Sequence, residues 1–426
     1  MPDQHALLSA SKMTLWESCR GAPALWERIP VKEERSVYAE EGTLAHTVGE
    51  QVLRGDIDSS LDYDFSQHHD IRIGVDFHTA VMHYVEYVDA RVRTLTKRDG
   101  RRSAIQIEQR LSLANLGFED MFGTGDCVLS TPSTLAVIDY KHGAGVAVAI
   151  QSDDFRPNRQ LMYYLLGAIA GELSESMASR ALEFTTADKL NTKAGQEWLK
   201  DFKQWIAERY EHLELHVVQP RVWVKDQQLN VTAQDVILFY QDLVSAVGLA
   251  QQQRKCETGN LKLEVGDHCR WCKVRNQCPA RVQAAINEAM EEFKQMDDLV
   301  QSSESSINCL DSASLSEILL KAEKVERLIT VLRGNAEARL RTGEEIPGFA
   351  LVPKRPQRKW YNEMDVLDLL RERLGEQADH CLSVRTPAQV LKLAPKSLTK
   401  ELESLVVKES SGLKLGKSNE EETNSA

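Results

Sequence analysis

The stretch T-L-A-V-I-D-Y-K-H-G, residues 134–143, decides the fold of this chain, together with the N-R-Q-L-M-Y-Y-L-L-G that follows a short loop at residues 158–167. The first part is a short apolar run that contains β-branched residues and closes at Gly143, which predicts a buried strand. Asp139 and Lys141 stand two apart at its end and therefore share one face. A carboxylate and an ammonium are costly to bury without a purpose, so we expect a functional site here.

The second part predicts a helix on which Gln160 and Tyr164, four residues apart, share one side. Upstream, G-T-G-D places Asp126 early in another predicted strand, and a turn at residues 131–133 connects this strand to the one just described. A hairpin of this kind brings Asp126 near Asp139.

A third polar pair lies in the helix predicted over residues 39–54, which begins near E-G-T-L-A-H. His46 and Glu50 are one turn apart on a strip beside its apolar face, where they also suit a plain surface pair. In the strand predicted at residues 104–113, alternation turns Ile105 and Ile107 inward. Glu108 falls on the other face, and we expect it to be an exposed strand residue.

The order of these residues resembles the motif series of the PD-(D/E)XK nucleases of the RecB-like branch: His46, Asp126, Asp139-Tyr140-Lys141 and Gln160-x-x-x-Tyr164. The chain also resembles an uncharacterised phage and prophage family of that superfamily, over nearly its whole length. The shared blocks are H-A-L-L-S-A-S, E-G-T-x-A-H, I-D-Y-K-H-G and a C-terminal T-P-A-Q…L-V-V-K.

This resemblance implies an α/β fold with a restriction-endonuclease-like core, in which helices flank a mixed central sheet. We expect the nuclease core and its cysteine cluster at residues 1–300 and a mostly helical C-terminal module at residues 307–408. Residues 409–426 are dominated by Gly, Ser and Glu, cannot bury a core, and are expected to be disordered.

The resemblance also implies roles for the site residues. His46, Asp126, Asp139 and the backbone carbonyl of Tyr140 would bind Mg²⁺ or Mn²⁺, ions that prefer oxygen ligands, and the imidazole favours Mn²⁺. Lys141 would orient or deprotonate the attacking water, while Gln160 and Tyr164 would position Lys141 or the DNA backbone. The plain alternative is that Asp139 and Lys141 form an edge-strand ion pair and that Tyr164 is only a core residue.

The second predicted site is a cysteine set, Cys269, Cys272 and Cys278 in C-x₂-C-x₅-C, with Cys19 from the far end of the chain. Four thiolates suit either tetrahedral zinc or an iron–sulfur cluster. The arrangement is similar to the iron–sulfur subgroup that includes the AddB-type and CRISPR-adaptation nucleases, which favours a 4Fe–4S cluster. Zn²⁺, with His268 as a possible fourth ligand, is the alternative.

Composition narrows the class of protein. The 426 residues are 42% hydrophobic, include eight cysteines and contain no apolar run long enough to span a membrane. The N-terminus has no secretory signal, so we expect a cytoplasmic protein of the bacterial host. The net charge of −12 argues against coating nucleic acid by bulk charge but allows local basic tracks. Two such tracks, which also suit solvated surfaces, are Arg91, Arg93, Lys97, Arg98, Arg101, Arg102 and Lys354, Arg355, Arg358, Lys359.

The site residues, together with the resemblance, predict a metal-dependent DNA nuclease; the resemblance implies an exonuclease in phage replication, recombination or repair. Its expected partners are DNA and phage single-strand-binding, recombinase or helicase proteins. The alternative is a catalytically silent iron–sulfur or zinc protein that binds DNA or acts as a scaffold. A repair subunit that works with a separate helicase is a third possibility.

Overall fold

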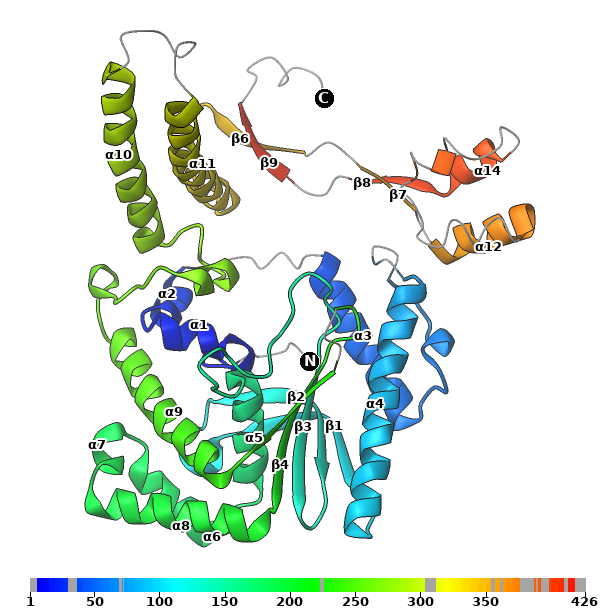
Figure 1. Ribbon diagram of the computed structural model, residues 1–426, viewed down its shortest axis with the longest axis vertical. Coiled ribbons are helices and arrows are strands. Elements are labelled where there is room, and N and C mark those ends of the chain that lie inside the picture. Colours follow the sequence, from blue (N-terminus) through cyan, green and yellow to red (C-terminus); the bar gives the residue numbers. More distant parts are fainter. Residues whose placement is uncertain are drawn as a thin grey trace. The chain divides into compact units, whose positions relative to one another are not determined.

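The fold was analysed in a computed structural model of the chain (Figure 1). The residues described are 6–29, 37–68, 71, 73–222, 226–302, 312–353, 357–360, 363–375, 387, 390–391, 398–409 and 413–417, with the side chains of 292–302, 312–322, 357–359, 363–364, 408–409 and 413–417 left aside.

A five-stranded mixed sheet organises the first part of the chain, in the order β1-β2-β3-β4-β5. Its strands are β1 (Ala104–Ser112), β2 (Phe122–Ser130), β3 (Thr134–Tyr140), β4 (His212–Val218) and β5 (Asp226–Val231). All neighbouring pairs are antiparallel except β3 and β4, which run parallel. The central strand β3 is buried along its whole length, as its apolar sequence predicts.

The parallel β3–β4 pair requires a crossover, which four helices provide: α5 (Arg159–Gly171), α6 (Glu175–Ala181), α7 (Ala187–Leu190) and α8 (Lys193–Arg209). Helix α5 packs against β1, β2 and β3, and it begins at Asn158, whose side chain accepts hydrogen bonds from the Gln160 and Leu161 amides. This cap fixes the first turn of α5, which carries Gln160 toward the end of β3.

Helices α3 (Val37–Arg54) and α4 (Val75–Asp99) pack on the sheet through a cluster of buried apolar residues. Leu44 and Val48 of α3 and Tyr84 of α4 belong to one buried cluster with Ile138 and Tyr140 of β3. The sheet therefore lies between α5 and the α3–α4 pair (Figure 1). An α/β fold with helices flanking a mixed sheet is confirmed.

Contacts within the chain divide it into two compact units. The first comprises residues 1–17, 34–252 and 359–407, and the second comprises residues 18–33, 253–358 and 408–426. Beyond the elements above, the first contains α1 (Met13–Ser18), α9 (Ala233–Arg254), α12 (Glu363–Leu374) and α14 (Thr399–Ser404), and the second contains α2 (Ala22–Arg28), α10 (Pro279–Ser302) and α11 (Ser312–Arg341). The segments 1–300 and 307–408 stay predictions of domain organisation.

Short strands complete the C-terminal part. Strand β6 (Phe349–Pro353) pairs antiparallel with β9 (Leu413–Lys417), and β7 (Gln357–Trp360) pairs with β8 (Val406–Glu409). The structure differs here from the expected disorder of residues 409–426, because 413–417 form a strand. Its L-K-L-G-K sequence places leucines at alternate positions, which suits a strand with one apolar face.

Two arginines of the first predicted basic track form ion pairs with a buried carboxylate of the sheet. Arg91 and Arg98 of α4 both bind the carboxylate of Glu214, which is buried on β4, with 3.2 Å between Arg98 Nη1 and Glu214 Oε1. His216 Nε2 lies 3.3 Å from the same carboxylate. A buried carboxylate needs partners of this kind. Arg91 and Arg98 are therefore structural, and the second track lies outside the described side chains.

This cluster predicts a loss of stability in acid. Burial raises the pKa of Glu214, but hydrogen bonds from His216 and Arg91 outweigh it and hold the pKa at about 2. A carboxyl whose folded-state pKa lies below the usual value stabilises the fold above about pH 4.5, and loses that contribution of about 3 kcal/mol as the pH falls toward 2. Urea unfolding from pH 6 to pH 3 should show this loss in wild type and in the control Glu86→Gln, exposed on α4. Glu214→Gln should be less stable at pH 6 and should flatten the slope; an unchanged slope would contradict the assignment.

No helix in the described part of the chain combines the length and apolar character needed to cross a membrane.

Candidate metal and phosphodiester site

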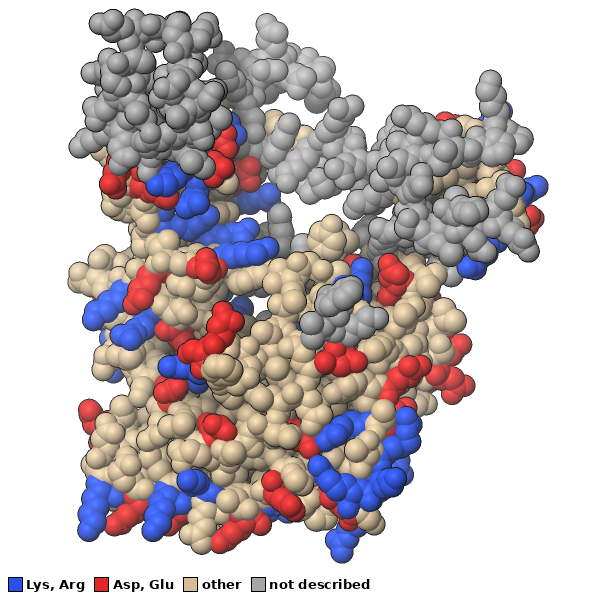
Figure 2. Space-filling model, viewed as in Figure 1, with Lys and Arg blue, Asp and Glu red and all other residues tan. Residues whose placement is uncertain are grey.

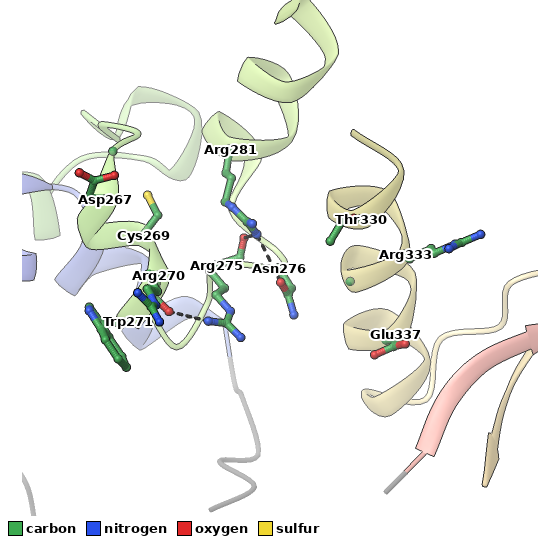
Figure 3. Close-up of a pocket in the computed structure, with 12 residues that line it drawn as sticks. Asp267, Cys269, Arg270, Trp271, Arg275, Asn276, Arg281, Thr330, Arg333 and Glu337 are labelled. Atoms are coloured by element: carbon green, nitrogen blue, oxygen red, sulfur yellow. Dashed lines mark hydrogen bonds between the residues drawn. The ribbon is translucent and has the colours of Figure 1, made fainter. Parts of the chain in front are cut away.

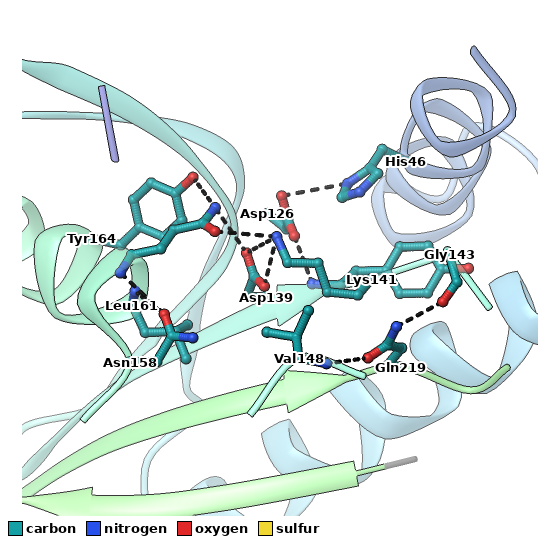
Figure 4. Close-up of polar contacts among 12 residues, drawn as sticks. His46, Asp126, Asp139, Lys141, Gly143, Val148, Asn158, Leu161, Tyr164 and Gln219 are labelled. Atoms are coloured by element: carbon teal, nitrogen blue, oxygen red, sulfur yellow. Dashed lines mark hydrogen bonds and ion pairs between the residues drawn. The ribbon is translucent and has the colours of Figure 1, made fainter. Parts of the chain in front are cut away.

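The candidate site forms at the end of β3, where four elements meet (Figure 4). Helix α3 contributes His46, strand β2 contributes Asp126, and helix α5 contributes Gln160. Asp139 and Tyr140 are the last two residues of β3, and Lys141 follows the strand. All residues predicted for the catalytic site are thus brought together, although they are far apart in the sequence.

Three possible metal ligands gather on one side of the site. His46 Nδ1 lies 3.4 Å from Asp126 Oδ1 and 3.6 Å from Glu108 Oε1. One ligand atom from each of the three residues lies within 4.8 Å of the other two. Two carboxylates and an imidazole are a donor set that Mn²⁺ or Mg²⁺ can use, so the residues fit a divalent ion.

The backbone of β3 orients the central ligand. The Tyr140 amide donates a hydrogen bond of 2.6 Å to Asp126 Oδ2, which leaves Oδ1 facing His46. The Tyr140 ring stacks on Tyr84 of α4, with 4.5 Å between centroids, and its centroid lies 5.2 Å from that of His46. Tyr140 therefore supports the ligands through its amide and ring, and ligation by its carbonyl stays a prediction.

Asp139, which was expected to be a metal ligand, is not in this group; with Lys141 it forms the other side of the site. Lys141 Nζ lies 3.0 Å from Asp139 Oδ2, and it donates to Gln160 Oε1 at 3.4 Å. The side chain of Asp139 is only 4% exposed, whereas that of Lys141 is 27% exposed. The ion pair of the plain alternative is thus present, but β3 pairs with β2 and β4 and is not an edge strand.

Helix α5 holds Lys141 from the opposite direction. Gln160 Nε2 donates to Tyr164 Oη at 2.9 Å and to Asp139 Oδ1 at 3.4 Å, so one amide joins both residues. Tyr164 is a buried core residue and also a hydrogen-bond partner. Its ring packs so closely on β2 that a Cβ at Gly123 would lie 2.7 Å from Tyr164 Cε1. This close approach explains the first glycine of G-T-G-D.

The charges of the site are mutually dependent. Burial lowers the pKa of His46, but the Asp126 carboxylate outweighs this and raises it to about 10. Burial raises the pKa of Asp139 to about 6, with Lys141 acting in the opposite direction. For Lys141, burial favours the neutral amine, but Asp139 and Asp126 outweigh it and raise the pKa. Lys141 is thus a cation in this arrangement.

Glu108 is the site residue that the sequence analysis missed. It was expected to be an exposed strand residue, yet it faces His46 and Asp126. It has a left-handed backbone with φ of 49°, which breaks the alternation of β1. The prediction from alternation that Ile105 points inward is also wrong, because Ile105 is 38% exposed. The neighbouring register pairs, Ile107 with Cys127 and Gln109 with Gly125, place Glu108 opposite Asp126. Hairpin register was the signal that could have revealed it.

Glu50, the other candidate beside His46, lies outside the ligand group. Its carboxylate is 2.8 Å from Arg54 Nη2 on the same helix. The alternative of a surface pair between His46 and Glu50 is therefore wrong: Glu50 pairs with Arg54, and His46 lies beside Asp126 and Glu108.

We expect Glu108→Gln to weaken Mn²⁺ binding by roughly tenfold or more, since an amide is a poorer ligand than a carboxylate for a hard cation. Glu50→Gln is the matched control, because this glutamate also lies near His46 but is paired with Arg54. Titration calorimetry with Mn²⁺ measures both. Equal affinities in the two variants would remove Glu108 from the ligand set.

The predicted cysteine set lies within the second unit. Cys19, Cys269, Cys272 and Cys278 are all free thiols. The Glu264 amide donates to Cys19 Sγ at 3.4 Å, and Trp26 Nε1 donates to Cys272 Sγ at 3.3 Å. Burial raises the pKa of Cys19, and nearby Cys278 and Cys272 raise it further. The N-terminal segment and the cysteine block are therefore neighbours, and Cys19 and Cys272 accept hydrogen bonds. Among the described residues, however, no three of the cysteine sulfurs lie within 4.8 Å of one another, so the cofactor itself stays a prediction.

Comparison with protein families gives one match. A family described as "Protein of unknown function (DUF2800)" matches residues 5–174 and 205–421. The chain belongs to this family. The unmatched residues 175–204 contain α6, α7 and most of α8, in the crossover, so the family match includes every residue of the candidate metal site and of the cysteine set.

Proposed function

We propose that this chain is a metal-dependent DNA nuclease that hydrolyses phosphodiester bonds. The observation that carries the proposal is the pairing of two groups in one site: the His46–Glu108–Asp126 ligand set, and the Lys141 ammonium held by Asp139. The superfamily assignment to PD-(D/E)XK nucleases of the RecB-like branch belongs to this proposal. Exonuclease action and a role in phage DNA replication, recombination or repair rest on the resemblance.

Hydrolysis adds water to phosphorus, breaks the bond from phosphorus to the leaving sugar oxygen, and ends with a proton on that oxygen. A bound divalent ion supplies charge that stabilises the phosphate as negative charge develops. Lys141 adds a second positive charge beside the same phosphate. The raised pKa of Lys141 favours this electrostatic role over proton abstraction. Gln160 keeps the ammonium in place through its hydrogen bonds to Lys141 and Asp139.

The direct test incubates the full chain with end-labelled single-stranded and double-stranded DNA. We expect degradation with Mn²⁺ or Mg²⁺ and none in the presence of EDTA. Binding of DNA without degradation, under all of these metal conditions, would refute the nuclease and support the silent DNA-binding alternative. Products that shorten progressively from labelled ends distinguish exonuclease action from internal cleavage.

We further propose that the four cysteines bind a 4Fe–4S cluster, with Zn²⁺ as the alternative. Hydrogen bonds from N–H groups to sulfur, as at Cys19 and Cys272, suit thiolate ligands of either cofactor. Such a site joins the N-terminal segment to the block at residues 269–278 and would be structural. Anaerobic purification should give brown protein that contains iron; colourless protein that contains zinc would favour the alternative.

A further inference from the structure

A polar pocket lies within the second unit (Figure 3). Its volume of about 910 Å³ is within the range of small-ligand sites. The cysteine block, the start of α10 and helix α11 form its walls. The charged and aromatic side chains that line it are Arg270, Trp271, Arg275, Arg281, Arg333, Asp267 and Glu337.

Positive charge exceeds negative charge among the lining residues, which include four arginines and two acidic residues. Figure 2 shows a group of Lys and Arg side chains on this part of the second unit. Within the described residues, none of the four guanidinium groups has a carboxylate oxygen within 4.0 Å in an ion pair. In Figure 3, Arg270, Arg275 and Arg281 come from the cysteine block and the start of α10, whereas Arg333 comes from α11 and its side chain points away from them. Guanidinium groups such as those of Arg270 and Arg275 are suited to phosphate oxygens.

Internal hydrogen bonds hold two of these arginines in place. Arg275 Nη1 donates to the Arg270 carbonyl at 2.5 Å, and Arg281 Nη1 donates to the Arg275 carbonyl at 3.2 Å (Figure 3). Each bond uses one nitrogen and leaves other donors of the guanidinium group available. The arginines are thus oriented before a ligand arrives, which lowers the entropic cost of binding.

Trp271 gives the pocket an apolar surface. Its side chain is 67% exposed although it is a large aromatic residue, and the guanidinium of Arg270 lies 5.0 Å from its ring centroid. An exposed indole costs free energy unless a partner covers it. An aromatic ring beside arginines is the arrangement with which proteins bind single-stranded nucleic acid, with a base on the ring and phosphates on the cations.

We infer that this pocket binds single-stranded DNA, with an unpaired base stacked on Trp271 and the backbone phosphates near Arg270 and Arg275. A duplex fits less well, since its base faces already stack on each other and are not available to the indole. The inference takes DNA as the ligand from the proposed function, but it assigns a separate site and a strand preference.

The test measures fluorescence anisotropy of labelled oligo(dT) with the full chain in EDTA, so that binding is observed without cleavage. Trp271→Ala should weaken binding roughly tenfold. Arg270→Ala combined with Arg275→Ala should weaken it at least as much and lower the slope of log affinity against log salt by about 1.4. Arg327→Ala, an exposed α11 arginine that pairs with Glu288, is the control and should match wild type. Circular dichroism checks that each variant is folded.

Binding and cleavage can fail independently in this design. If folded Trp271→Ala and the double arginine variant bind oligo(dT) like Arg327→Ala, the inference is wrong, even where cleavage is observed. Equal loss of affinity for oligo(dT) and for an abasic oligomer in Trp271→Ala would also refute base stacking. Tighter binding of duplex than of oligo(dT) would refute the strand preference.

Discussion

Lys141→Met should reduce DNA cleavage by about 10³-fold while metal binding is kept, because removing one group that stabilises transition-state charge costs about 10²–10³-fold. Methionine preserves the length and volume of the side chain and removes only its charge. Lys141 contributes no atom to the His46–Glu108–Asp126 ligand set, so the substitution leaves this set intact. The measurement is the initial rate on end-labelled DNA at saturating Mn²⁺.

Lys200→Met provides the matched control, since this lysine is exposed on α8 and outside the site. It should cleave at the wild-type rate. Lys141→Arg separates charge from position: it keeps the cation, but its wider planar head does not fit the contacts to Asp139 and Gln160. We expect Lys141→Arg to recover only part of the activity. Wild-type cleavage by Lys141→Met would exclude Lys141 from the reaction.

The sequence was sufficient to predict the centre of this site because local rules apply there. The apolar run at residues 134–140 predicts a buried strand, and its period of two places Asp139 and Lys141 together. Helical spacing does the same for Gln160 and Tyr164, which share a hydrogen bond. In both pairs the decisive neighbours are two to four residues apart.

The features that the sequence analysis missed depend on distant neighbours. Glu108 becomes a candidate ligand only because an unusual backbone conformation combines with the register of β1 on β2. Arg91 and Arg98 look like a basic surface track until β4 supplies Glu214. The strand β5 was also missed: its D-Q-Q-L-N-V sequence is mostly polar, since it is an edge strand that is only partly buried. Periodicity carries no information about such long-range pairing.

Asp126→Asn should abolish the response of the protein to divalent metal. Asp126 presents Oδ1 to His46, while its Oδ2 is fixed by the Tyr140 amide. Asparagine can still accept that amide hydrogen bond, so the local fold is retained while a charged ligand is lost. In wild type, Mn²⁺ at 100 times its Kd should stabilise the fold by about 2.7 kcal/mol. In Asp126→Asn the same Mn²⁺ concentration should give almost no increase in Tm and no cleavage.

Asp120→Asn is the control for this experiment, because Asp120 is an exposed aspartate just before β2. It should keep both the metal-dependent increase in Tm and the cleavage. The combination of readouts makes the result specific. Loss of cleavage with a normal increase in Tm would show that Asp126 acts on the substrate instead of on the ion, while a normal increase together with normal cleavage would exclude Asp126 from the site. Without the Asp126 carboxylate, the ligand group would retain one acid, Glu108, and one imidazole, His46, too few ligands to hold Mn²⁺ firmly.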